Sequence, residues 1–408
     1  MALTQIPPVM IDGGLGLDWQ SSVETSSFTA VNGNGYFVNT TSGSITVTMS
    51  SSPTTGDSIG IIDYAGTAAS NIIILTSSNN IQGSSDDKIV NYTRGALRIT
   101  YADTTQGWVA SAAANEGTSA LNPSPFLVDY LVVAGGGGGG ASNLYSQGSG
   151  GGGAGGFITS TLAVNVSVSY PVTVGDGGAV ASPGLDSIFS NITSTGGGNG
   201  GNDAGGGSSG GSGGGSGAQS GLAGYAGNAG GFTPVEGNNG GGGSASAYVG
   251  GGGGGGGAVG KPGSSNWDGG AGGAGIINNI LNTTNATTAS VGQVSGTDVY
   301  YTGGGGGGNL GGGGAGAAGG IGGGGRGSSA NASYPNIAGS PNTGGGGGGG
   351  IDGPKPGVPG GSGVVILKYP NTFLLTKTGI IEASGSPFTD GTNLVSVFTG
   401  GTGTITFS

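Results

Sequence analysis

Runs of glycine constrain this chain more than any other feature of its sequence. Of its 108 glycines, 13 precede residue 129 and 6 follow residue 369, so glycine is concentrated in the segment between them. Glycine loses more backbone entropy on folding than any other residue, and it makes poor helices and strands. The segment therefore needs a structure in which a missing side chain is an advantage. The runs recur at similar lengths, at residues 135–140, 150–153, 240–243, 250–257, 303–308, 311–314, 322–325 and 344–350.

Glycine content this high is typical of disordered, low-complexity chain. This segment differs, because it is nearly uncharged and contains Ala, Val, Ile, Phe and Tyr between the runs. Two apolar, strand-like stretches bound it, at residues 130–134 and 363–369. Runs of similar length also indicate a repeated structural unit. We therefore expect residues 129–369 to form one ordered glycine-rich domain, with its first and last strands in one sheet.

Because glycine has no side chain, runs of it can adopt the left-handed threefold polyproline-II helix, which is called polyglycine II here. Such helices can pack closely side by side, and each N–H and C=O then bonds to a neighbouring helix. Collagen is excluded because no Gly-X-Y period exists. A phosphate-binding loop is excluded because no run continues into Gly-Lys-Ser or Gly-Lys-Thr. The sequence predicts a polyglycine-II bundle.

Three motifs of this segment together resemble the glycine-rich domain of bacteriophage tail-fibre and adhesin proteins. They are the strand and six glycines of residues 130–140, the PVTVGDGG of residues 171–178 and the GVVILKY of residues 363–369. In the best understood relatives, the distal adhesins of some T-even-like phages, this domain is a polyglycine-II bundle whose loops contact the bacterial receptor. The resemblance covers residues 129–369 and implies that fold and a role in host attachment. Receptor loops vary between relatives, so it transfers no binding residue.

The chain before this segment has a different composition. Residues 1–22 contain two adjacent prolines and predict either a disordered terminus or an extended docking arm. This start resembles those of cyanophage and marine-phage fibre proteins. Residues 23–112 carry short strands separated by turn signals, so we expect an antiparallel, sandwich-like β module. Its residues 28–112 resemble a module of phage fibre proteins. Residues 71–75 are apolar on both faces, which predicts a central or interface strand. Residues 113–128 read as a linker.

Residues 161–174 predict a strand pair beside the first strand of the glycine-rich domain, and residues 187–193 a further short strand. Residues 370–408 predict three short strands, at 373–376, 394–398 and 403–407. A piece this small is not stable alone. It must pack on the glycine-rich domain or on copies of itself. The predicted class for the whole chain is all-β.

Composition narrows the possible functions. A net charge of −11 with eight Lys plus Arg argues against nucleic acid as a partner. The chain has no Cys and no His, which removes thiolate chemistry, the usual general base and the usual zinc ligands. No signal peptide and no membrane-spanning run is visible. The acids Asp57, Asp63, Asp86, Asp87 and Asp103 follow turn patterns, so we expect them to bond backbone and not to catalyse. We expect no enzyme activity, no cofactor and no metal.

Recognition must come from the segments between the glycine runs, since polyglycine has no side chains to offer. Aromatic residues among Asn, Ser and Gly are typical of adaptable binding surfaces. The alternative is that these rings cap the ends of the bundle. The candidates for receptor contact are Tyr145, Tyr225, Tyr248, Trp267, Tyr300, Tyr301 and Tyr334.

The sequence thus predicts a phage tail-fibre adhesin on the exterior of the virion. Its expected partners are a bacterial surface protein or polysaccharide and, through the N-terminal arm, other tail proteins. The apolar strand at residues 71–75 and the small C-terminal piece favour a homotrimer. Two alternatives are a purely structural fibre, spacer or decoration protein, and a polysaccharide depolymerase. The second lacks the opposed carboxylates that glycoside hydrolysis needs.

Overall fold

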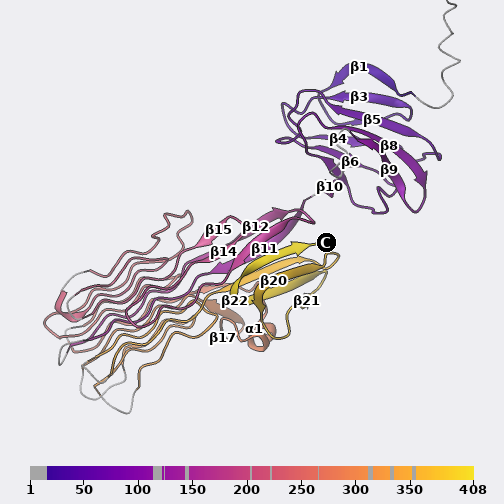
Figure 1. The fold of residues 1–408 in the computed structure, drawn as a ribbon. Coiled ribbons are helices and arrows are strands. Elements are labelled where there is room, and N and C mark those ends of the chain that lie inside the picture. The colour runs from indigo at the N-terminus through magenta and orange to yellow at the C-terminus, as the bar shows by residue number, and fades with distance from the viewer. Residues whose placement is uncertain are drawn as a thin grey trace, which may run out of the picture. The chain divides into compact units, whose positions relative to one another are not determined.

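The computed structural model describes residues 16–113, 122–123, 125–142, 147–202, 205–220, 223–264, 266–310, 316–330, 335–351 and 355–408. Two compact units make up the chain, Met1–Phe126 and Leu127–Ser408. Both are built of β-strands and extended chain, with one short α-helix among the described residues, so the all-β prediction is confirmed (Figure 1).

The first unit is a sandwich of two five-stranded sheets. One sheet has the order β1-β3-β5-β8-β9 and the other β10-β7-β6-β4-β2. Alternate residues of the strands face inward, and the core they form includes Ile59, Leu75 and Trp108, all fully buried. The strands are β1 (Asp18–Glu24), β2 (Phe28–Thr29), β3 (Asn34–Val38), β4 (Ile45–Thr48), β5 (Ser58–Asp63), β6 (Ile73–Thr76), β7 (Lys88–Val90), β8 (Ala96–Asp103), β9 (Gly107–Ala113) and β10 (Asn122–Pro123).

The prediction of an antiparallel N-terminal module was wrong in part. Strands β1, β3 and β5 run parallel in one sheet, and β2, β4 and β6 run parallel in the other. The reason is that the chain alternates between the sheets from β1 to β6. Each return to a sheet therefore comes after a full circuit and runs in the same direction as before. Antiparallel pairing begins only with β6–β7 and β5–β8.

Several details of this unit follow the sequence. Strand β6 is central in its sheet, as predicted, with Ile73 and Leu75 fully buried. Asp63 accepts hydrogen bonds from the backbone N–H groups of Gly66 and Ala68, both at 3.1 Å, which confirms its expected role in a turn. Strand β1 begins within the predicted arm, whose residues 1–15 lie outside the described part. Strand β10 lies within the predicted linker and pairs with β7.

The second unit contains a nine-stranded sheet. Its order is β12-β11-β19-β22-β13-β14-β15, and β20 and β21 also pair with β22. The first and last strands of the glycine-rich segment, β11 and β19, lie in this one sheet, as predicted, and the structure shows them to be antiparallel neighbours. The strands are β11 (Phe126–Val133), β12 (Phe157–Val164), β13 (Ser169–Thr173), β14 (Ser187–Phe189), β15 (Ile192–Ser194), β19 (Val364–Pro370), β20 (Leu375–Glu382), β21 (Phe388–Asp390) and β22 (Asn393–Phe407).

Two predictions for this sheet need correction. Strand β12 lies beside β11, but β13 pairs with β22 and β14 and is not the partner of β12. The predicted strands at residues 394–398 and 403–407 are one continuous strand, β22. Irregular pairing with β20 around Gly400 and Gly401 lets this strand bend without ending. The long β22 then supplies a partner for β13 that no local pattern in the sequence reveals.

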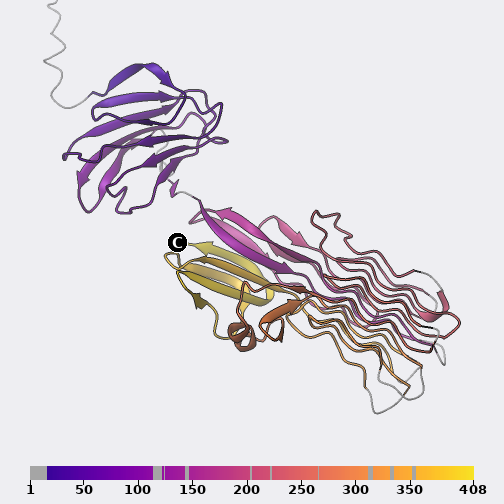
Figure 2. The ribbon, with the colours of Figure 1, turned by 180° about the vertical axis from the view of Figure 1, so that it is seen from behind.

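Extended glycine-rich rods run from this sheet to the opposite end of the unit (Figures 1 and 2). We call the end with the strands the sheet end and the opposite end the loop end. The rod of residues 148–156 shows how the rods are joined, because its consecutive N–H groups donate to three different rods in turn. The bonds are Gly151 to Gly251 O (2.9 Å), Gly152 to Gly347 O (2.8 Å) and Gly153 to Gly198 O (2.8 Å).

The carbonyl groups of the same rod accept from three further rods. The donors are the N–H groups of Gly215 to Gly151 O (2.8 Å), Gly305 to Gly152 O (2.9 Å) and Gly137 to Gly153 O (2.8 Å). After three residues the sequence of partners repeats, since Ala154 N–H returns to the first neighbour at Gly254 O (3.0 Å). A period of three and six neighbours are what packed threefold helices require. The predicted polyglycine-II bundle is confirmed.

A small folded insertion covers one face of the large sheet at the sheet end. It consists of the sheet β16 (Ile276–Ile277), β18 (Asp298–Tyr301) and β17 (Gln293–Ser295), and α1 (Thr283–Ala289) lies between β16 and β17 in the chain. Asn282 caps the helix by accepting from Asn285 N–H at 2.9 Å. Ala286, Ala289 and Tyr301 of this insertion join a core with Val133 and Ile366 of the large sheet. The sequence suggested a loop here.

Candidate functional site

Two of the predicted aromatic candidates, Tyr248 and Trp267, lie together at the loop end of the second unit. Their ring centroids are 6.2 Å apart, and the ring planes are inclined at 37°. The side chains are 44% and 47% exposed. The rings therefore touch without stacking face to face, and much of their apolar surface stays in water. We call Tyr248 and Trp267 the aromatic pair.

Neighbouring rods bring the two rings together. Tyr248 lies in the loop of residues 244–249, which the rod of residues 250–257 follows. Trp267 lies two residues before the rod of residues 269–275. These rods are joined by a bond from Gly270 N–H to Gly250 O at 2.9 Å. The spacing of the rods therefore sets the spacing of the rings.

Both rings are carried by backbone in the left-handed region, with φ of 55° at Tyr248 and 67° at Trp267. This region is uncommon for residues other than glycine, and for bulky side chains it is a true outlier. It costs of order 1–3 kcal/mol and persists where surrounding structure enforces it. Here the loops enforce it, since Ser244 and Val249 exchange backbone bonds of 2.9 and 3.3 Å and Ser264 N–H donates to Asp268 O at 2.9 Å.

The other described candidates do not join this pair. Tyr145 and Tyr334 lie outside the described residues. Tyr225 is part-buried, and its ring packs on the backbone of Gly207, where a Cβ would lie 2.2 Å from the ring. This contact fits the alternative that some aromatics cover the rods. Tyr300 lies in β18 at the sheet end, far along the rods from the aromatic pair.

Tyr301 cannot contact a receptor, because its side chain is fully buried in the core below the large sheet. Alternation along β18 turns Tyr301 inward and Tyr300 outward. Burial raises the pKa of the Tyr301 hydroxyl far above its ordinary value, and among the described residues the hydroxyl has no hydrogen-bond partner. The prediction for this residue was wrong because no sequence pattern revealed the folded insertion.

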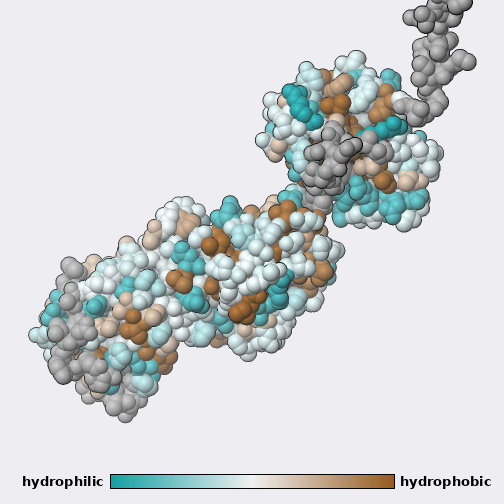
Figure 3. All heavy atoms as spheres, viewed as in Figure 1, coloured by the Kyte–Doolittle hydropathy of each residue, from teal (hydrophilic) through white to brown (hydrophobic). Residues whose placement is uncertain are grey.

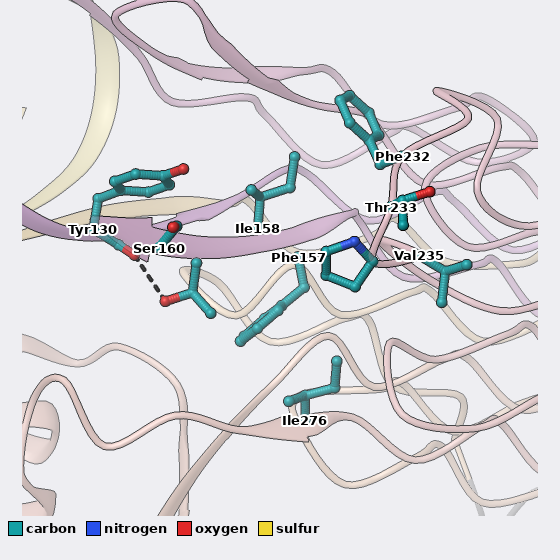
Figure 4. A pocket seen from close by; sticks show the side chains of 10 residues that line it. Tyr130, Phe157, Ile158, Ser160, Phe232, Thr233, Val235 and Ile276 are labelled. Carbon is teal, nitrogen blue, oxygen red and sulfur yellow. Dashed lines mark hydrogen bonds between the residues drawn. The ribbon is translucent and has the colours of Figure 1, made fainter. Parts of the chain in front are cut away.

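A pocket of about 400 Å³ lies at the sheet end along β12 (Figure 4). Aromatic and aliphatic side chains dominate its lining, among them Tyr130, Phe157, Phe232 and Ile276. The Thr159 hydroxyl donates to Tyr130 O at 2.8 Å and so is already used. No carboxylate lines the pocket, so it offers space for an apolar group and no acid or base.

Glu236 follows this pocket in sequence and is fully buried, which sequence reasoning missed. Its carboxylate accepts from Thr195 N–H at 2.9 Å and from Gly230 N–H at 3.4 Å. Burial raises the pKa of this carboxyl above its ordinary value, and the nearby Asp186 charge adds to the effect. The bonds fasten the loop before Glu236 to the rods, so its role is structural. Glu236 is the single Glu of residues 129–369, and this was the available signal.

The first unit has an exposed aromatic surface of its own. Trp19 contacts Phe37 with centroids 5.2 Å apart, and Phe37 contacts Tyr64 at 6.5 Å. Trp19 is 41% and Tyr64 50% exposed. The indole lies against Gly35, where a Cβ would come within 2.5 Å of the ring. These three rings, the N-terminal aromatic row, lie on the outer face of the sheet that contains β1, β3 and β5.

In the described part of the chain, no group of three His, Cys, Asp or Glu side chains is placed to hold a metal ion. None of the described helices has the length and hydropathy to cross a bilayer. On the face shown in Figure 3 most of the second unit is neither strongly polar nor strongly apolar, as its glycine and serine content implies.

The fold defines the class of this protein as all-β with a polyglycine-II bundle that is closed by a sheet at one end. The chain belongs to a family described as a glycine-rich domain, which matches residues 112–370. The match ends with β19, and the strands β20 to β22 that complete the sheet follow it. No curated protein matches the chain.

Proposed function

We propose that this protein is a bacteriophage tail-fibre adhesin that attaches to the bacterial surface through the loop end of its polyglycine-II bundle. The observation that carries the proposal is the aromatic pair. Two adjacent loops each hold a bulky ring in an unfavourable backbone conformation and leave it about half exposed. Strained backbone conformations cluster at functional sites, and exposed apolar clusters often mark contact surfaces, so the two features together favour recognition.

The bundle suits this role as a rigid support. Its rods satisfy their backbone groups by bonding to one another, and the loops are thereby fixed at one end of the unit. Sites built on rigid elements lose less entropy when they bind. In this proposal the protein binds without catalysing a reaction, stands on the exterior of the virion and joins other tail proteins through its N-terminal part.

A homotrimer is part of the proposal. Of the two sequence features that favoured it, the small C-terminal piece no longer does so. Strand β22 pairs with β19 and β13 of its own chain, so the C-terminal piece is complete without a second copy. The remaining argument is the outer face of β6, where Ile72 and Ile74 are part-exposed. The molar mass from light scattering decides between the states, and a monomer at all concentrations tested would remove the trimer.

The second candidate is a structural fibre or spacer that contacts only virion proteins. The N-terminal aromatic row favours it, because exposed apolar clusters often mark protein contacts. In that case the row would be the docking surface and the loop end would have no ligand.

Cell binding by the fluorescently labelled full-length protein separates the two candidates. We expect it to bind host cells and the Tyr248→Gly/Trp267→Gly double variant to lose more than about tenfold in affinity. Glycine accepts positive φ, so these substitutions remove the rings without straining the loops. Leu374→Ala is the matched control, since Leu374 is 65% exposed but lies next to β20 at the sheet end. An intact protein that binds virion particles and no cells would favour the structural fibre.

A further inference from the structure

We propose that the aromatic pair binds a neutral saccharide of the bacterial surface. The inference rests on the proposed attachment function and names the class of its ligand. It follows from the geometry of the rings, the rigidity of their loops, the polar groups around them and the small size of the site.

The geometry leaves ring faces free for a ligand. Tyr248 and Trp267 are inclined at 37° with centroids 6.2 Å apart, and each keeps nearly half of its surface exposed. A pyranose ring has C–H groups on its faces and hydroxyl groups around its rim. An aromatic face has negative charge density and an apolar body, so it packs well against such C–H groups.

The rings are oriented before any ligand arrives. Their backbone is held by the bonds within the loops and, at Tyr248, by Gly148 N–H, which donates to Tyr248 O at 2.8 Å. Gly148 begins the rod of residues 148–156, so this bond fastens the backbone of Tyr248 directly to the bundle. Saccharides bind weakly at single sites. Because this site is already ordered, little binding free energy is lost to ordering side chains and loops when the sugar binds.

The neighbouring side chains are short and polar. Ser246, Asn266 and Asp268 are exposed in the same two loops and offer a hydroxyl, an amide and a carboxylate. Together they can donate to and accept from sugar hydroxyl groups. Asp268 is the single charged residue of residues 244–249 and 264–268, and the chain has a net charge of −11. Acidic sugars would be repelled, so a neutral saccharide fits best.

The size of the site also favours a sugar over a protein surface. A stable protein interface buries roughly 800 Å² on each partner around an apolar centre. Among the described residues of these two loops, the two half-exposed rings are accompanied by the exposed side chains of Ala245, Ser246, Asn266 and Asp268, none of which is large and apolar. One or two sugar residues match this surface.

The test uses full-length protein and two kinds of probe. The first is an array of immobilised neutral oligosaccharides of glucose, galactose, mannose and rhamnose, beside uronic acid oligosaccharides. The second is host cells treated either with periodate, which oxidises surface sugars, or with a protease. We expect binding to neutral members of the array and loss of cell binding after periodate alone.

Variants locate the site. Trp267→Gly and Tyr248→Gly should each lower saccharide affinity by more than about tenfold. Trp19→Ala, which removes a comparably exposed indole from the first unit, should leave it unchanged. Equal losses in all three variants would overturn the assignment to the aromatic pair.

The outcomes separate this inference from the attachment function. Cell binding that survives periodate but not protease, with an empty array, would overturn the saccharide and keep the adhesin. Array binding without cell binding would keep the saccharide site and overturn attachment. Binding to neither probe would overturn both.

Discussion

The two units of this protein form dense interiors from different parts of the chain. The first unit buries side chains, with Ile59, Leu75 and Trp108 fully inside the sandwich. The bundle of the second unit buries backbone, and its interior is made of glycine rods that bond to six neighbours each. Among the described residues, the apolar side-chain core of the second unit lies at the sheet end, where the insertion packs on the large sheet. The comparison shows that a chain poor in large apolar residues can still have a dense interior.

The two interiors differ in what they tolerate. A side-chain core responds to lost volume, because a removed group leaves a cavity. A backbone core has no group to remove and responds to added volume. In the bundle a Cβ at Gly151 would lie 2.1 Å from Gly305 O, and a carbonyl on a packed rod cannot rotate away. Each kind of interior therefore has its own most damaging substitution.

The largest expected effect is that of Gly151→Ala. Replacing glycine with alanine lowers the conformational entropy of the unfolded chain, which by itself stabilises the folded state by up to about 1 kcal/mol. The clash of the new Cβ with the backbone outweighs this stabilisation. We expect a loss of about 3 kcal/mol or more in the free energy of unfolding of the second unit. Hydrogen exchange followed by mass spectrometry would show faster exchange across the rods and no change in the first unit.

The control for this prediction is Gly400→Ala in β22. A Cβ there meets nothing closer than the Ile381 side chain at 3.4 Å, and the backbone needs no positive φ. Stability should stay the same or rise slightly. Similar costs at Gly151 and Gly400 would show that the rods are not packed as described. Ala154, a natural residue of the same rod, shows that the effect depends on position.

The second effect is that of Leu75→Ala in the first unit. Leu75 is fully buried in β6, so truncation removes apolar contacts and leaves a cavity. We expect a loss of about 3 kcal/mol confined to the first unit. Val31→Ala, at a 60% exposed position, should change stability by less than about 0.5 kcal/mol. Calorimetry that shows equal shifts for both variants would contradict a side-chain core here.

How far the sequence predicts this structure also differs between the regions. The bundle was predictable because close packing of rods requires residues without side chains, and only glycine meets this requirement. Two similar strands at the ends of one segment predicted that β11 and β19 lie in one sheet, and the structure shows in addition that they pair directly. The parallel strands of the first unit were not predictable, because direction depends on how the chain alternates between two sheets. No local pattern records that path.

The candidate site shows the same limit. Composition pointed to aromatics between the glycine runs, and two of them, Tyr248 and Trp267, do meet at the loop end. Which two would meet depends on which rods are neighbours, and glycine runs are too alike to show this. Tyr301 was misassigned for a related reason. The insertion that buries it is held by contacts with strands distant in sequence, such as Val133 and Ile366.

A smaller effect that distinguishes the two units is the pH response of Glu236. Its carboxyl is buried among rods, and its pKa in the folded state is raised above the ordinary value of 4.5. Between 4.5 and the raised pKa the folded state binds more protons than the unfolded state, so stability falls as pH rises through this window. Glu236→Gln, which keeps an acceptor for Thr195 N–H, should remove this part of the slope. Urea midpoints measured across the window would test it, and an unchanged slope in the variant would contradict it.

The smallest effect concerns two buried tyrosines at the sheet end, where the second unit resembles the first in having a side-chain core. The Tyr301 hydroxyl has no partner among the described residues, whereas the Tyr369 hydroxyl lies 3.0 Å from Ser396 Oγ in a buried hydrogen bond. Tyr301→Phe removes an unsatisfied polar group and should stabilise the unit by about 1 kcal/mol. Tyr369→Phe leaves the Ser396 hydroxyl without this bond and should destabilise it by about 1 kcal/mol. Thermal unfolding of the two variants should therefore shift in opposite directions. Shifts of the same sign would mean that the Tyr301 hydroxyl has a partner, such as an enclosed water molecule, and that this core is more polar than the sandwich core.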